Sequence, residues 1–233
     1  MQGDRKGLFV DLEGGDASGK ATQTAFLREE LVRLTGKPVS VFSFPRYGQS
    51  LAADLVAEMT RGDHGDPMEM SSKIASLPFT LDRVLAASDL QSALSRGHLI
   101  CDRYVPSNLA YQAAKFKEVS EQDSYILWLE SLEYGECALP RPDLVLFLDV
   151  SPHVSRRLLL QRARVLDRNE MSLAYQEQVY EVYVRLSRER ADWKVVHCLD
   201  GQNQLRAPED IREEISQIVL DYYSSLIGEE GTV

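Results

Sequence analysis

The sequence predicts a three-layer α/β fold, in which a parallel sheet of five strands is flanked by helices. Short apolar runs alternate with longer amphipathic runs, which is the pattern of βαβ units. Four of the five short runs are almost continuously apolar, as in strands buried on both faces. The length of 233 residues suits one core, because single cores grow to roughly 250 residues before a chain divides.

Three strands are predicted in the first half of the chain, because three runs there are short and apolar: residues 8–12, 39–44 and 98–102. The helical stretches between them cover residues 20–34, 51–61 and 70–95. In the last stretch, apolar residues from Ile74 to Leu94 recur near helical spacing. Pro78 lies inside it, and we expect this proline to kink the helix or to mark a new start.

The second half supplies the last two strands, predicted over residues 144–150 and 194–198. Helices are predicted over residues 107–117, 125–133, 152–163, 173–191 and 208–226. We find no internal repeat, low-complexity tract or linker, so residues 1–233 are predicted to form a single domain. The small and polar tail, residues 228–233, is expected to fray.

The composition narrows the possible partners and location. A formal net charge of -10 argues against general nucleic-acid binding, which needs clustered Lys and Arg. No apolar run is long enough to cross a membrane, and the first apolar run is too short for a secretion signal. Three widely spaced cysteines indicate neither a disulfide framework nor a zinc site. We therefore expect a cytoplasmic protein without a nucleic-acid or membrane partner.

A glycine-rich loop follows the first predicted strand and leads directly into a helix. Residues 14–20 match the pattern GxxxxGK of a P-loop, which predicts a P-loop NTPase fold. In such a loop, backbone N–H groups and a helix N-terminus face phosphate oxygens, and Lys20 reaches the β and γ phosphates. The residues predicted to bind ATP here are Gly14, Gly15, Asp16, Ala17, Ser18, Gly19, Lys20, Ala21 and Thr22.

One position departs from the usual loop. The Ser or Thr that normally follows the lysine and binds Mg²⁺ is Ala21 in this chain, with Thr22 one residue later. Metal binding must therefore depend on other oxygens. No NKxD sequence, with which a GTPase reads guanine, is present.

Several short motifs then follow in a fixed order. They are FPRYGQS at residues 44–50, FTLDR at 79–83, DRYVPSNLAYQ at 102–112 and RARVLDRNE at 162–170. This series resembles the thymidylate kinase family, and most closely its mycobacterial branch. The resemblance extends from residue 8 to about residue 200. It implies transfer of the γ-phosphoryl group of ATP to dTMP in dTTP synthesis, with Mg²⁺, by a homodimer.

The resemblance also assigns residues to the acceptor nucleotide. Arg103 would grip the dTMP phosphate, with Arg46 and Tyr47 as further contacts. Phe79 would stack on thymine and Arg83 would bind its carbonyl; the two are four residues apart, on one helical face. The remaining residues of the predicted dTMP site are Asp16 near the sugar, Asn108 at the base edge, Tyr111 where a ribose 2′-hydroxyl would lie, Gln112 and Glu170.

The segment 162–170 resembles the short lid of these kinases, although a basic stripe is more often a solvated helix face. Arg162, Arg164 and Arg168 would carry positive charge to the transferred phosphoryl group, because the phosphate loop has no Arg or Lys before Lys20. Lys20 and Arg103 complete the predicted catalytic set. The predicted metal ligands are Asp16, Asp102 and Glu170. By a weaker match, Asp200 would lie near the adenine.

Two other functions remain open on the sequence. A kinase of the same fold could act on uridylate, cytidylate or a deoxynucleoside. The residues that favour thymidylate are Phe79, Arg83, Asn108 and Tyr111. A nucleotide-binding regulator without catalysis is suggested by Ala21 alone. The retained Lys20 and the arginines count against it, because binding by itself would not need all of them.

Overall fold

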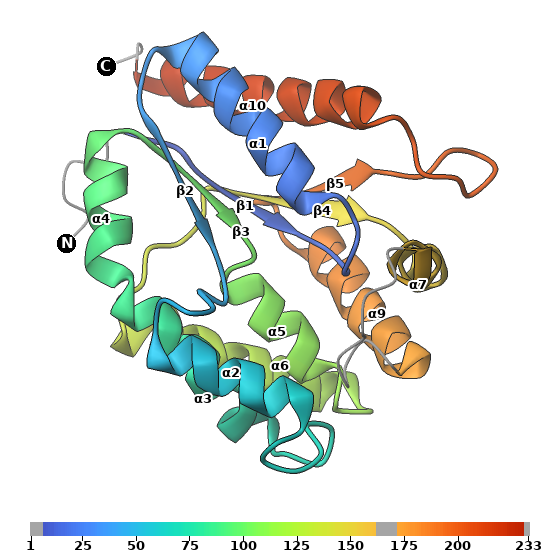
Figure 1. The fold of residues 1–233 in the computed structure, drawn as a ribbon. Coiled ribbons are helices and arrows are strands. Elements are labelled where there is room, and N and C mark those ends of the chain that lie inside the picture. The colour runs from blue at the N-terminus through green and yellow to red at the C-terminus, as the bar shows by residue number, and fades with distance from the viewer. Residues whose placement is uncertain (1–6, 162–171, 231–233) are drawn as a thin grey trace.

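A parallel sheet of five strands forms the centre of the molecule (Figure 1). The computed structural model describes residues 7–161 and 172–230. The strands lie in the order β2-β3-β1-β4-β5, so the first strand is central. Their bounds are β1 Phe9–Glu13, β2 Val39–Ser43, β3 His98–Asp102, β4 Leu144–Asp149 and β5 Trp193–His197. The predicted strand number and parallel arrangement are confirmed.

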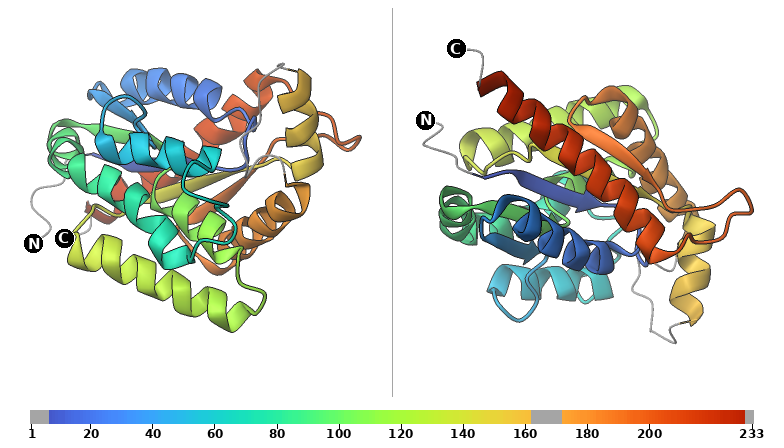
Figure 2. Two further views of the ribbon diagram at one scale, coloured as in Figure 1. Left: turned by 60° about the horizontal axis from the view of Figure 1, so that its bottom comes forward. Right: turned by 90° about the horizontal axis from the view of Figure 1, so that it is seen from above.

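Helices cover both faces of the sheet, as the two views of Figure 2 show. The first half of the chain contributes α1 Lys20–Thr35, α2 Leu51–Arg61, α3 Ser72–Leu85, α4 Ala87–Arg96 and α5 Val105–Ala113. The second half contributes α6 Val119–Glu130, the π-helical segment η1 Ser131–Glu136, α7 Pro152–Gln161, α9 Leu173–Glu189 and α10 Pro208–Glu230. None of the described helices is both long and apolar enough to cross a membrane.

The alternation of side chains along β1 separates two apolar cores. Phe9 packs with side chains from α4, α5, α6 and α9 on one face. Val10 and Leu12 pack on the other face with side chains from α1 and α10. Because successive residues of a strand point to opposite faces, this one strand contributes to both cores. The predicted three-layer fold is therefore confirmed.

The predicted helix over residues 70–95 is two helices, and the break is not where the sequence indicated it. Helix α3 continues through Pro78, and the chain turns at Ala86, which caps α3 and precedes α4. A proline removes the bond to the carbonyl four residues earlier, here that of Ile74. The Ile74 side chain is 59% exposed, so this turn of the helix faces solvent, where water can bind the freed carbonyl.

The parallel strands bring three predicted segments together at one edge of the sheet. The phosphate loop follows β1, residues 44–47 follow β2, and Arg103 follows β3. Since β2, β3 and β1 are neighbours, these carboxyl ends are adjacent. Open α/β sheets bind ligands at this edge, so the order of the strands places the candidate site.

Candidate active site

The phosphate loop is a compact turn between β1 and α1. Gly14, Ala17 and Gly19 all have positive φ values, 141°, 58° and 93°. A side chain on Gly14 would lie 2.8 Å from the carbonyl oxygen of Leu148, so both its φ value and its packing against β4 require glycine. Glycine therefore allows the loop to pack directly against the sheet.

Lys20 folds back over this loop. Its Nζ donates to the carbonyls of Gly14 at 3.1 Å and Gly15 at 2.8 Å. Burial, with a smaller effect of the nearby Arg103 charge, lowers the pKa of Lys20 from 10.5 to about 8. A phosphate in the loop would offer this ammonium a stronger acceptor than the neutral carbonyls. Ala21 and Thr22, the next residues, are exposed.

Arg103 connects the phosphate loop with the neighbouring pocket. It follows β3 with a φ of 66°, and its guanidinium donates to the Asp16 carboxylate at 2.6 Å and to Ser107 Oγ at 3.1 Å. The same guanidinium lies 5.4 Å from the ring centre of Tyr111, whose hydroxyl donates to Asp16 at 3.3 Å. One carboxylate of the phosphate loop is thus bonded to two residues that line the neighbouring pocket.

This neighbouring pocket, the candidate acceptor pocket, lies between the end of the sheet and helices α3 and α5. It brings together most of the residues predicted to bind dTMP. The lining includes Asp16, Tyr47, Phe79, Arg83, Arg103, Asn108, Tyr111 and Gln112. Arg46 is not among its lining residues. The Arg46 guanidinium is instead held beside the pocket by the carboxylate of Asp82, with Nε 3.0 Å from Oδ1.

One corner of this pocket carries buried polar groups. Arg83 is 2% exposed, and its guanidinium forms a paired hydrogen bond with Glu133. Asn108 and Gln112 are also buried, and the side-chain carbonyl oxygens of both have no hydrogen-bond partner among the described residues. A buried acceptor without a partner is costly, so a ligand that donates hydrogen bonds here would be favoured.

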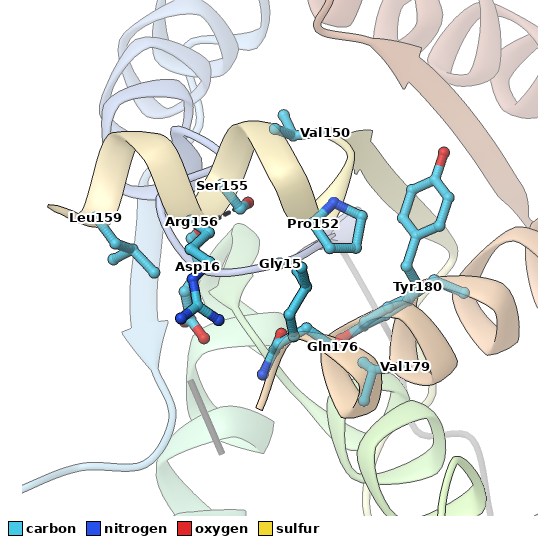
Figure 3. A pocket seen from close by; sticks show the side chains of 12 residues that line it. Gly15, Asp16, Val150, Pro152, Ser155, Arg156, Leu159, Gln176, Val179 and Tyr180 are labelled. Atoms are coloured by element: carbon cyan, nitrogen blue, oxygen red, sulfur yellow. Dashed lines mark hydrogen bonds between the residues drawn. The ribbon is translucent and has the colours of Figure 1, made fainter. Parts of the chain in front are cut away.

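A smaller hollow that Asp16 also lines lies between α7 and α9 (Figure 3). Ser155 of α7 donates to the backbone carbonyl of Asp16 at 2.6 Å. Pro152, Gln176 and Val179 line the hollow with Gly15 and Asp16. The phosphate loop is therefore supported by α7 at the point where it faces the acceptor pocket.

The predicted metal ligands are partly described. Asp16 is in the phosphate loop, Asp102 ends β3, and the charges of both act on Lys20. No cluster of three or more His, Cys, Asp or Glu side chains able to bind a metal occurs within residues 7–161 and 172–230. Mg²⁺ in kinases is usually held by one or two carboxylates, phosphate oxygens and water. Two carboxylates beside a phosphate loop fit that donor set.

Asp200 lies in the loop between β5 and α10 and is absent from the described pockets near the phosphate loop. Its carboxylate accepts from the backbone N–H groups of Gln202 and Gln204, both at 2.8 Å. The end of this loop lies near the first turn of α1, which follows the phosphate loop, because Gln23 of α1 donates to the carbonyl of Pro208 at 3.0 Å. Arg162, Arg164, Arg168 and Glu170 fall outside the described residues.

The sequence did not indicate three acidic residues that hold this site. Glu13 accepts from the backbone N–H groups of Tyr104 and Ser107 and so fixes the turn at Arg103. Asp82 holds Arg46, and Glu133 holds Arg83. A signal was present for Glu133, which continues the buried stripe Tyr125 and Leu129 at a spacing of four. An acid on an apolar stripe is rarely buried without a partner.

Comparison with known proteins gives a consistent result. The family model described as thymidylate kinase matches residues 12–208. A thymidylate kinase of Mycobacterium tuberculosis is 36% identical over 187 residues, covering 77% of this chain and 86% of that protein. One of Arabidopsis thaliana is 30% identical over 221 residues, covering 93% and 72%. The solved structure of a thymidylate kinase from Candida albicans superposes with a TM-score of 0.72 at 23% identity, covering 93% of this chain and 92% of that one.

Proposed function

The chain belongs to the thymidylate kinase family and transfers the γ-phosphoryl group of ATP to dTMP; we propose that the residues at the carboxyl ends of β1, β2 and β3 carry out this reaction. The observation that carries the proposal is the Arg103–Asp16 contact of 2.6 Å. It joins the phosphate loop, which would hold the donor, to the pocket, which would hold the acceptor. Phosphoryl transfer depends on this alignment and on neutralising charge.

In the proposed reaction Lys20 leaves the loop carbonyls and binds the β and γ phosphates of ATP. Arg103 exchanges Asp16 for the phosphate of dTMP, which holds the two nucleotides in line. Lys20 is buried and Arg103 is mostly buried, so an electrostatic contact with either cation is stronger than in water. Tyr111, next to Arg103, would face the deoxyribose, and Phe79 would stack on the base.

Mg²⁺ would be held by Asp102 and Asp16, together with phosphate oxygens and water. When bound, it would neutralise charge on the phosphates. This assignment would compensate for Ala21, which has no hydroxyl to offer. The arginines of segment 162–170 would add positive charge from above the donor, and Glu170 would approach the acceptor, as the family resemblance implies. Asp200 would act indirectly, by shaping the loop after β5.

A homodimer is proposed on the basis of helix α3. Four large apolar side chains lie along one stripe of this helix and remain 44–59% exposed: Ile74, Leu77, Leu81 and Leu85. Their spacing of three and four residues keeps them on one face. A second copy of the chain would cover this face. We place the enzyme in the cytoplasm, where dTTP synthesis would use its product, and propose neither a nucleic-acid nor a membrane partner.

The test is a coupled assay of ADP formation with dTMP, dUMP, UMP and CMP. The wild type should prefer dTMP. Arg103→Ala should lower turnover with dTMP by a factor of about a hundred or more, because a charge-assisted clamp on phosphate in a closed site contributes several kcal/mol. A preference for UMP or CMP would instead favour the neighbouring specificities, and no ADP formation with any acceptor would favour a regulator.

Arg190→Ala is the matched control. This arginine pairs with Glu130 at 2.6 Å, between the end of α9 and α6, and does not line the acceptor pocket. Its removal should leave turnover within about twofold of the wild type, since a partly exposed ion pair contributes on the order of 1 kcal/mol to stability only. Near-normal turnover of the Arg103 variant would remove Arg103 from the proposed mechanism.

A further inference from the structure

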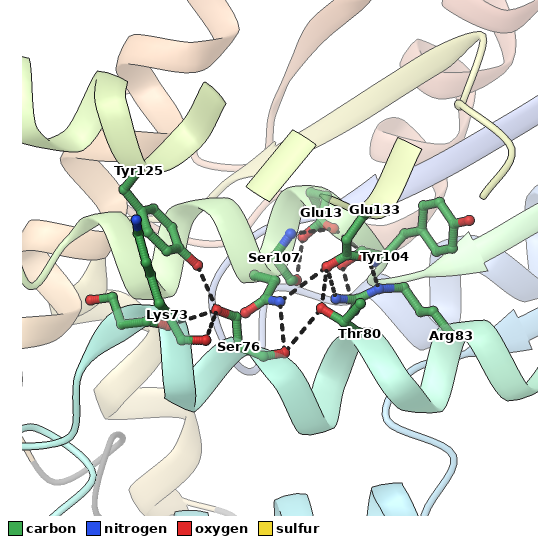
Figure 4. Close-up of polar contacts among 11 residues, drawn as sticks. Glu13, Lys73, Ser76, Thr80, Arg83, Tyr104, Ser107, Tyr125 and Glu133 are labelled. Carbon is green, nitrogen blue, oxygen red and sulfur yellow. Dashed lines mark hydrogen bonds and ion pairs between the residues drawn. The ribbon is translucent and has the colours of Figure 1, made fainter. Parts of the chain in front are cut away.

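Glu133 is a fully buried carboxylate outside the pocket lining, at 0% exposure. It lies on η1, the π-helical segment that continues α6. Figure 4 shows its carboxylate pointing toward Arg83 and Thr80 of the neighbouring helix α3. A π-helical turn inside a longer helix is rare and often occurs near functional sites. Here the π-helical turn places the Glu133 carboxylate against Arg83 and Asn108, which line one corner of the acceptor pocket.

The two oxygens of Glu133 accept hydrogen bonds from two helices. Oε2 accepts from Arg83 Nε at 2.6 Å, and Oε1 accepts from Arg83 Nη2 at 2.5 Å. Oε1 also accepts from Thr80 Oγ1 at 2.9 Å and from Asn108 Nδ2 at 3.2 Å. Arg83 and Asn108 both line the pocket. A single carboxylate therefore orients two side chains that face the acceptor nucleotide.

Glu133 fixes the orientation of the Asn108 side-chain amide. The amide nitrogen donates to Glu133 and also to the backbone carbonyl of Ser76 at 3.3 Å. Turning the amide over would place its oxygen against a carboxylate and a carbonyl, which is repulsive. Asn108 Oδ1 is therefore held as an acceptor, and it is buried without a partner among the described residues.

Arg83 supplies the complementary group. Three of its N–H bonds are used, two by Glu133 and one by the carbonyl of Tyr104 at 3.3 Å. A guanidinium has five N–H donors, so two remain for a ligand. A donor and a fixed acceptor in one corner match a pyrimidine edge in which a carbonyl adjoins a ring N–H. Cytosine presents an amino group beside a ring acceptor, which is the reverse pattern.

We propose that Glu133 is a positioning residue that sets the base preference of the acceptor site for pyrimidines with a carbonyl beside a ring N–H, and against cytosine. The proposal rests on the proposed function, because it assumes that the base occupies this corner. Glutamine at position 133 would be isosteric, yet either orientation of its amide would turn an N–H group toward an Arg83 donor. Arg83 and Asn108 would then no longer be oriented by one shared hydrogen-bond acceptor.

The experiment measures equilibrium dissociation constants for dTMP and dCMP, without ATP, by titration calorimetry. The wild type is compared with Glu133→Gln and with Glu133→Asp, which keeps the charge but shortens the side chain. We expect the dTMP-to-dCMP affinity ratio to fall about tenfold or more in Glu133→Gln, because the oriented donor and acceptor that match thymine are lost. Glu133→Asp should give a smaller fall. The loss should be in dTMP affinity, with dCMP weakened less.

Tyr125→Phe is the matched control, since it removes another bond of the same network without touching Arg83 or Asn108. The Tyr125 hydroxyl donates to Ser76 Oγ at 3.2 Å. This variant should lower the melting temperature and keep the affinity ratio. Equal weakening of dTMP and dCMP in both Glu133 variants would overturn the proposal and leave Glu133 a purely structural residue.

The experiment also covers variants that do not fold and a wild type that does not prefer dTMP. If Glu133→Gln does not fold, Glu133→Asp carries the test. If neither folds, NMR of the wild type decides: the Asn108 side-chain NH₂ should be protected from exchange without ligand, and free exchange would overturn the proposal. A wild type that binds neither nucleotide, or prefers dCMP, contradicts the proposed function and not only the role of Glu133.

Discussion

At the scale of single residues, Asp11 stands apart from the apolar strand that contains it. The side chain is 0% exposed, and neither carboxylate oxygen has a hydrogen-bond partner among the described residues. Burial raises the pKa of Asp11 well above 3.8, and the negative charge of nearby Glu13 raises it further. Glu13, whose contact with Asp11 helps to raise this pKa, has other partners of its own, because it accepts from Tyr104, Ser107 and Tyr183.

Asp11→Val should therefore stabilise the protein at pH 7. The folded state keeps a proton on Asp11 that the unfolded state loses above about pH 4, so the free energy of unfolding falls as pH rises from there to the raised folded pKa. We expect the variant to gain about 1–3 kcal/mol at pH 7, the cost of a buried polar group without a partner. Urea denaturation from pH 4 to pH 8 measures the difference.

Exposed Asp221 provides the control for this change. Asp221→Asn on α10 should leave the pH dependence of unfolding as in the wild type. A loss of stability in Asp11→Val at pH 7 would mean that the carboxyl group has a favourable partner in the folded protein.

Residues that belong to local motifs could be assigned to the candidate site from the sequence, whereas residues that act through a neighbour could not. Gly14, Lys20 and Arg103 belong to local motifs whose spacing reflects contact with phosphate. Glu133 contacts Arg83, fifty residues earlier in the chain, and no local pattern encodes that contact. The sequence also could not indicate that the Arg83 guanidinium is held by a buried carboxylate before any base binds.

At the scale of elements, strands were located to within about two residues, whereas helix boundaries inside long amphipathic stretches were not. The strands β1, β3 and β4 are buried on both faces, so apolar composition alone marks them. In residues 70–95 the same apolar spacing continues through Ala86, where the chain leaves α3 and enters α4. The sequence did not predict the π-helical turn after α6 either. This turn places Glu133 against Arg83, and that contact joins residues far apart in the chain.

The prediction at the scale of elements concerns the segment 162–170, between α7 and α9. It carries Arg162, Arg164 and Arg168, and the phosphate loop itself has no Arg before Lys20. Arg164→Ala should lower kcat far more than it weakens ATP binding, because a contact made mainly in the transition state does not stabilise bound ATP. Arg162→Ala should show a smaller effect of the same kind, and Arg168→Ala the smallest.

Steady-state kinetics and a separate ATP titration measure this split for each variant. Arg185→Ala is the matched control, because Arg185 pairs with Asp123 at 2.6 Å on the surface and should change neither quantity. Equal losses of affinity and turnover in all three variants would assign these arginines to ATP binding alone. The catalytic charge would then come from Arg46, Arg103 or a partner subunit.

At the scale of the whole molecule, the exposed apolar stripe of α3 is the basis of the proposed homodimer. The stripe lies on the side of α3 away from the pocket, and Leu127 of α6 is also 65% exposed. The two helices are neighbours, since Lys73 lies 5.0 Å from the ring centre of Trp128. Contiguous exposed apolar groups of this kind mark an interaction surface. A symmetric pair of chains would bury the same patch on both subunits.

The double variant Leu77→Glu and Leu81→Glu should therefore be a monomer where the wild type is a dimer. Placing four like charges across a two-fold interface, two from each subunit, adds repulsion to the loss of apolar burial. Sedimentation velocity over a range of concentrations measures the state. Leu34→Glu on α1, a partly exposed leucine on the opposite face of the sheet, is the control and should remain dimeric. A monomeric wild type at all concentrations would contradict the proposal.

Because α3 also carries Phe79 and Arg83, we further expect the monomeric variant to bind dTMP more weakly, as its pocket wall loses external support.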